Sequence, residues 1–67
     1  MHRDVLKDKW NQLGGDIRKK WGDLTNDDLA RIQGDCEKFI GVLQEKYGYE
    51  RERAEKELND FLNRPAA

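Results

Sequence analysis

Residues that usually carry catalysis or bind metals are scarce in this 67-residue chain, which has no serine, one cysteine and one histidine. A single cysteine cannot form a disulfide within the chain, and a zinc site needs several Cys or His ligands. Nucleophilic catalysis needs a base held beside the nucleophile, and the one histidine, His2, is expected in a frayed terminus. Carboxylates are numerous, but none stands in an apolar setting that would raise its pKa for acid catalysis, and phosphate-binding glycine motifs are absent. We therefore expect no enzyme, no small-molecule substrate, no cofactor and no metal site.

Long apolar runs are missing as well. No stretch approaches the roughly 18 residues that a membrane-spanning helix needs, and no signal-peptide core is present. Charged residues make up 40% of the chain and hydrophobic residues 36%, so the composition lies close to that of disordered proteins. The net charge of only -1 and a strong apolar periodicity nevertheless indicate a folded chain. We expect a soluble cytoplasmic protein of one domain, of modest stability and without a membrane partner.

Basic residues gather in the N-terminal third of the chain. Residues 1–22 carry six Lys or Arg against three Asp, whereas residues 23–67 carry seven against eleven Asp or Glu. The run Arg18, Lys19 and Lys20 is therefore a candidate for contact with nucleic acid. Proteins that bind nucleic acid usually have a much larger basic excess, so a solvated helix face is the simpler interpretation.

Apolar residues at steps of three and four predict a first helix over about residues 4–21. They are Leu6, Trp10, Leu13, Ile17, Trp21 and Leu24. Both tryptophans share this narrow stripe, which is typical of a core-facing helix rather than of a base-stacking platform. Gly14 and Gly15 cost this helix about 1 kcal/mol each relative to alanine. Either another element approaches closely at Gly14 or the helix bends there.

A second helix is predicted over about residues 25–47. Gly22 is a candidate to end the first helix, and Thr25, followed by Asp27 and Asp28, is a typical helix start. An EF-hand loop is excluded here, because Asp28 and Gly34 stand where that loop needs Gly and Glu. The apolar residues keep one phase, which makes Cys36 a small core residue. They are Leu29, Ile32, Cys36, Phe39, Ile40, Leu43 and Tyr47.

Three small residues, Ala30, Gly34 and Gly41, project on the face opposite that stripe. They would leave a strip without side-chain bulk, which another backbone could approach. This strip is the candidate surface for a transient protein partner or for self-association. Local flexibility, or a break of the helix at Gly34, is the alternative.

A third helix is predicted over about residues 50–63, because Gly48 can end the second helix in the left-handed conformation. Pairs of opposite charge four residues apart support this helix: Arg51 with Glu55, Glu52 with Lys56 and Arg53 with Glu57. Its buried side consists of Ala54, Leu58, Phe61 and Leu62. Pro65 and the two alanines after it are expected to form a loose tail over residues 64–67. The chain is thus predicted as a single all-α domain over residues 1–67, ordered over about 4–63, with three main helices, or four if the second breaks at Gly34.

These motifs resemble the CsbD-like family of small bacterial stress-response proteins. The resemblance runs from about Asp4 to Phe61 and is carried by Lys9-Trp10, by Trp21-Gly22 with Leu24-Thr25 and the acidic residues that follow, by Gly34 and Gly41, and by Tyr47-Gly48-Tyr49 before residues 54–57. It implies helical hairpins packed across one another and production under general stress control, with no defined molecular activity. Gly15, Cys36 and Glu50 depart from the family pattern, in which Lys, a polar residue and a good N-cap are common.

Composition and resemblance together predict a non-enzymatic stress-response protein that acts by hydrophilic protection or through transient protein contacts. Weak nucleic-acid binding through the basic first helix is the alternative. A salt-dependent shift on mixing with DNA or RNA would distinguish the two.

Overall fold

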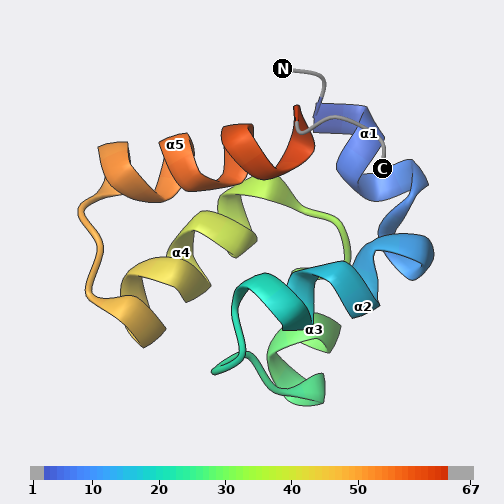
Figure 1. The fold of residues 1–67 in the computed structure, drawn as a ribbon, viewed down its shortest axis with the longest axis horizontal. Coiled ribbons are helices and arrows are strands. Elements are labelled where there is room, and N and C mark those ends of the chain that lie inside the picture. Colours follow the sequence, from blue (N-terminus) through green and yellow to red (C-terminus); the bar gives the residue numbers. More distant parts are fainter. Residues whose placement is uncertain (1–2, 64–67) are drawn as a thin grey trace.

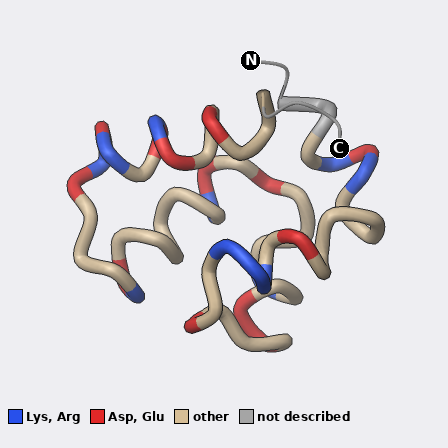
Figure 2. The backbone as a smooth tube through the Cα atoms, in the orientation of Figure 1, with Lys and Arg blue, Asp and Glu red and all other residues tan. Residues whose placement is uncertain are grey.

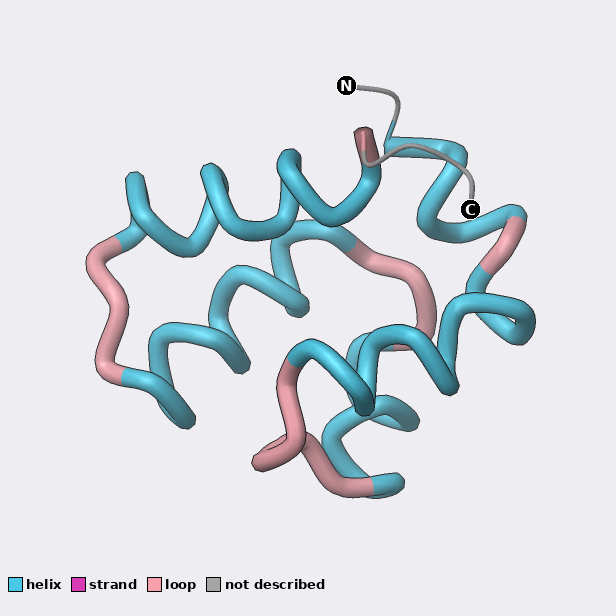
Figure 3. The backbone as a smooth tube through the Cα atoms, in the orientation of Figure 1, coloured by secondary structure: helices cyan, strands magenta, loops and turns pink. Residues whose placement is uncertain are grey.

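Five helices make up the part of the chain that the computed structural model describes, which is residues 3–63, with side chains from Leu6 onward. They are α1 (Arg3–Asp8), α2 (Trp10–Lys20), α3 (Asn26–Ile32), α4 (Cys36–Tyr47) and α5 (Arg51–Leu62), and these residues form no strand (Figures 1 and 3). The predicted all-α class is confirmed. His2 and the predicted tail at Pro65 lie outside the described residues.

Helices α4 and α5 lie side by side as an antiparallel pair, and α3 packs against α4 (Figure 1). Gly48 ends α4 in the left-handed conformation, with φ of 68°, as predicted. The third predicted helix is also confirmed, because α5 begins after Glu50 and buries the expected side. Ala54, Leu58 and Phe61 are buried, and Leu62 is partly buried against the core.

The second predicted helix is divided at Gly34 into α3 and α4, so the alternative of a break is the one that the chain adopts. Gln33 and Gly34 both take positive φ, at 44° and 80°. A Cβ on Gly34 would stand 2.7 Å from Cα of Lys7, so the backbone of α1 occupies the space of a side chain. Asp35 then begins α4, because its carboxylate accepts a hydrogen bond from the backbone N–H of Lys38 at 3.1 Å. The break therefore has both a local and a tertiary cause.

The prediction of one continuous helix over residues 4–21 is wrong, because the chain turns at Lys9 between α1 and α2. Lysine favours a helix interior, and Lys9 makes no side-chain capping hydrogen bond to α2. The turn is explained by tertiary contacts: it carries Leu6 into the core, with 0% exposure, and sets the backbone of Lys7 against Gly34. Helix α2 also ends one residue early, with Trp21 rather than Gly22 as its C-cap.

The core is centred on three aromatic rings. The ring centroid of Trp21 lies 5.1 Å from that of Phe39 and 5.2 Å from that of Phe61, which joins the end of α2 to α4 and α5. Most of the two predicted stripes is buried, whereas Trp10, Leu13, Leu29 and Tyr47 are only partly covered. The buried stripe residues are Leu6, Ile17, Trp21, Leu24, Ile32, Cys36, Phe39, Ile40 and Leu43.

Val42 is buried although it lies off the predicted stripe. Its burial follows from the break at Gly34, because α3 folds back and packs against α4. A straight helix over residues 25–47 would have left this second face of α4 uncovered. The break therefore enlarges the core beyond what periodicity predicted.

Gly14 and Gly15 lie in uninterrupted α2, and an added Cβ at either position would meet nothing within 4 Å. The predicted close approach at Gly14 is thus not found, and the chain turns at Lys9 instead. We expect Gly14→Ala and Gly15→Ala each to raise the free energy of unfolding by about 1 kcal/mol, because alanine restricts the unfolded chain and favours the helix. Urea denaturation followed by circular dichroism measures the change. A lower midpoint for either variant would contradict the open space around these residues.

Candidate protein-contact surface

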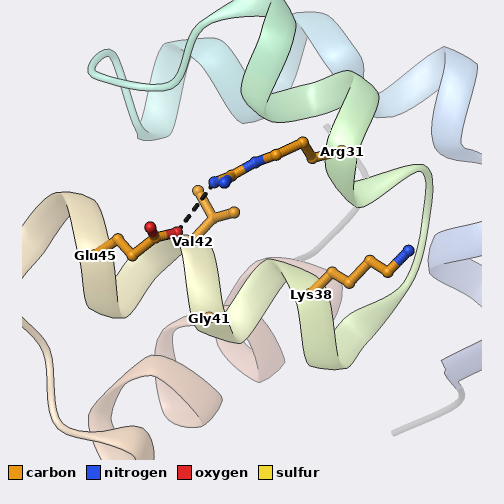
Figure 4. A pocket seen from close by; sticks show the side chains of 5 residues that line it. All are labelled: Arg31, Lys38, Gly41, Val42 and Glu45. Carbon is orange, nitrogen blue, oxygen red and sulfur yellow. Dashed lines mark hydrogen bonds and ion pairs between the residues drawn. The ribbon is translucent and has the colours of Figure 1, made fainter.

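Two shallow grooves on the described surface are both bordered by α3. The first, of about 460 Å³, lies between α3 and α4 and is lined by Arg31, Lys38, Gly41, Val42 and Glu45 (Figure 4). The second, of about 450 Å³, lies between α3 and the N-terminal helices and is lined by Lys7, Asp8, Trp10, Asn11, Leu29, Ala30 and Gln33.

The α3–α4 groove has charged edges over a floor without long side chains. Nη2 of Arg31 lies 3.0 Å from Oε2 of Glu45, so the side chain of Arg31 crosses the groove beside Val42 (Figure 4). Lys38 lies on the other side of Gly41 from Glu45. Gly41 and Val42 therefore form the least bulky part of a groove whose rim carries charged groups.

The small residues predicted to form one partner strip are separated in the structure. Ala30 borders the groove near α1, and Gly41 borders the α3–α4 groove. Gly34 is buried in the connection between α3 and α4. The continuous strip is therefore not formed, because the helix on which it was predicted breaks at Gly34. The two charged residues that meet across the groove, Arg31 and Glu45, were missed, since fourteen residues separate them in the chain.

Asp28 is a buried carboxylate at the start of α3, with 6% exposure. It forms the predicted helix start with Thr25: the N–H of Thr25 donates to Oδ2 of Asp28 at 3.0 Å, and the N–H of Asp28 donates to Oγ1 of Thr25 at 3.1 Å. Nζ of Lys46, near the end of α4, lies 3.1 Å from the same carboxylate. The backbone hydrogen bond from Thr25, followed by the interactions with Lys46, lowers the pKa of Asp28 despite its burial. The lowered pKa keeps Asp28 ionised at neutral pH. Its ion pair with Lys46 joins α3 to α4.

The lowered pKa of Asp28 makes part of the stability depend on pH. Its contribution is fully present above the ordinary pKa of 3.8 and is lost as pH falls through the lower pKa of the folded state. We expect Asp28→Asn to lower the free energy of unfolding by about 1 kcal/mol at neutral pH. The variant should then lose less stability than the wild type on acidification. Urea denaturation at neutral and acidic pH tests this, with the exposed Asp27→Asn as the control, and equal acid sensitivity of wild type and Asp28→Asn would contradict it.

The basic run predicted as a nucleic-acid candidate forms the last turn of α2 (Figure 2). Nη1 of Arg18 donates to Oδ1 of Asn26 at 2.7 Å. Nζ of Lys20 lies 3.6 Å from Oε1 of Glu57 and 5.3 Å from the ring centroid of Trp21. Two of the three basic side chains are therefore engaged by neighbouring residues, and all three positive charges suit the C-terminal end of a helix.

Metal-binding clusters and membrane-spanning helices are both lacking in the described part of the chain. No three or more His, Cys, Asp or Glu side chains in that part are grouped so as to hold a metal ion. Cys36, predicted as a core residue, is buried with 4% exposure. None of the described helices is both long enough and apolar enough to cross a membrane.

The described residues thus define a small all-α protein with shallow grooves and with several ion pairs between exposed side chains. The chain belongs to the CsbD-like family, whose family model matches residues 4–56. A UPF0337 protein of Pseudomonas aeruginosa is 53% identical over 64 residues, which cover 96% of this chain and 98% of the relative. A UPF0337 protein of Bordetella pertussis is 41% identical (96% and 97% covered), and UPF0337 protein YjbJ of Escherichia coli K12 is 39% identical (96% and 93% covered). No solved structure matches the chain.

Proposed function

We propose that this protein is a non-enzymatic stress-response protein that protects other macromolecules through its hydrophilic surface and through transient protein contacts. The observation that carries the proposal is the set of exposed ion pairs between different elements. Arg51 of α5 pairs with Glu37 of α4 at 2.7 Å, and Arg31 of α3 pairs with Glu45 of α4 at 3.0 Å. Exposed pairs contribute little to stability, so their charged groups can exchange partners at small cost.

The overall charge supports contact with many kinds of protein. Lys and Arg alternate with Asp and Glu along α5, and the net charge of the chain is only -1 (Figure 2). A mixed surface of this kind does not repel proteins of either sign, whereas a surface of one sign repels proteins of the same sign. The mean hydropathy of -1.11 shows that the chain as a whole is strongly hydrophilic.

Drying or heating a labile enzyme such as lactate dehydrogenase with this protein tests the proposal. We expect the wild type to preserve more enzyme activity than an equal mass of a variant carrying Glu37→Gln, Arg51→Gln, Arg31→Gln and Glu45→Gln, which keeps the net charge. Circular dichroism must first confirm that the variant is folded. Equal protection by both would contradict a role for the paired charges, and no protection by either would contradict the function.

Titration of a labelled DNA duplex tests the alternative of nucleic-acid binding. Because Arg18 and Lys20 are engaged and the net charge is -1, we expect an affinity weaker than about 1 μM at physiological salt. Sub-micromolar binding that is lost in Lys19→Gln and Lys20→Gln would favour the alternative.

A further inference from the structure

The connection between α1 and α2 is where local sequence and tertiary structure disagree most. Leu6, Trp10, Leu13 and Ile17 continue one helical phase across Lys9, yet Lys9 itself is non-helical, with φ of -106° and ψ of 13°. Lysine has high helix propensity, and a cation at the N-terminus of α2 opposes the helix dipole. No side-chain capping hydrogen bond stabilises the start of α2. The local sequence therefore favours a continuous helix, and the turn depends on the docking of α1.

Two residues in the described part of α1, Leu6 and Lys7, make contacts that depend on shape. Leu6 is fully buried, and the backbone of Lys7 lies where a side chain of residue 34 would stand. A helix of six residues is not stable alone in water, so α1 is helical because it is docked or because it continues α2. If α1 leaves this position, it can become a continuation of α2. The core then lacks the side chain of Leu6, and the space beside Gly34 lacks the backbone of Lys7.

We propose that two copies of this chain exchange α1, with Lys9 as the hinge, so that α1 of each copy occupies the site beside Gly34 of the other. The N-terminal end of α2 lies at the edge of the molecule, and a straight continuation of its axis runs out from the bundle (Figure 1). A continuous helix over residues 3–20 would be about 27 Å long, comparable to the longest dimension of the fold, 28 Å. Such a helix carries Leu6 away from its own core, and the second copy offers a site of matching shape.

A pair of substitutions at the hinge tests the exchange. Lys9→Ala and Lys9→Gly both remove the same exposed charge, but alanine favours a continuous helix and glycine disfavours it. Because a dimer contains two hinges, we expect a dimer dissociation constant about 30-fold lower for Lys9→Ala than for Lys9→Gly, with the wild type between them. Analytical ultracentrifugation over a range of protein concentrations measures these constants, after circular dichroism has confirmed folding. Equal constants for the two variants, or monomers only at every concentration, would overturn the proposal.

Isotope-filtered nuclear Overhauser spectroscopy on a mixture of labelled and unlabelled Lys9→Ala chains locates α1 in the dimer. Exchange predicts contacts between Lys7 of one copy and Gly34 of the other, which the monomer makes within one chain. Dimers in which these contacts arise only within a chain would show surface association instead and would overturn the exchange. Neither measurement depends on protective activity. The exchange can therefore fail while the protection test succeeds, and the protection test can fail while the exchange is observed.

Discussion

Replacing Trp21 with alanine is expected to lower the free energy of unfolding by about 3 to 5 kcal/mol. The indole is only 2% exposed and contacts the rings of Phe39 and Phe61 at centroid distances of 5.1 and 5.2 Å. Its loss would leave a cavity where α2, α4 and α5 meet. Domains of this size are stable by only a few kcal/mol, so the variant should be largely unfolded at room temperature. Thermal and urea denaturation followed by circular dichroism provide the measurement.

Trp10→Ala is the matched control for this substitution. Trp10 is only partly buried and makes one edge-on ring contact, to Phe39, at a centroid distance of 6.1 Å. Its replacement should therefore cost clearly less than that of Trp21. An unchanged melting curve for Trp21→Ala, or equal losses at the two positions, would contradict the central place of Trp21 in the core.

Gly34→Ala is expected to lower the free energy of unfolding by about 2 to 4 kcal/mol. Alanine in the left-handed region, here at φ of 80°, costs roughly 1 to 2 kcal/mol. The new Cβ would also stand 2.7 Å from Cα of Lys7, and such overpacking costs roughly 1 to 3 kcal/mol more. The backbone of Lys7 cannot rotate away as a flexible side chain would, so α1 must shift. Urea denaturation gives the loss, and amide hydrogen exchange in α1 shows whether that helix is released.

Two other glycines separate these effects. Gly48 has φ of 68° but nothing within 4 Å of an added Cβ, so Gly48→Ala should cost only about 1 to 2 kcal/mol. Gly41 lies inside α4 with equally open space, and Gly41→Ala should stabilise by up to about 1 kcal/mol. If Gly34→Ala lowers the free energy of unfolding no more than Gly48→Ala does, the close contact with Lys7 does not affect stability.

Much of the fold follows from local features of the sequence. Apolar spacing near 3.6 residues identified which segments are helical and most of the buried residues, because one face of each helix must leave water. Thr25 and Gly48 marked helix ends correctly, since capping and left-handed geometry depend on a few adjacent residues. The family resemblance rested on the same motifs.

Tertiary structure decided where these helices turn and which residues meet. The turn at Lys9 opposes local propensity and exists because Leu6 and Lys7 gain contacts with the core and with Gly34. The burial of Val42 depends on α3 folding onto α4, which no periodicity within one helix could reveal.

The charged contacts of the candidate surface were likewise settled only in three dimensions. Asp28 was predicted at a helix start, but its ion pair with Lys46 joins residues from two helices. Arg31 and Glu45 meet across the groove for the same reason. The tendency of a segment to be helical depends mainly on adjacent residues, whereas the places where helices turn and the pairing of distant side chains depend on how the whole chain buries its apolar surface.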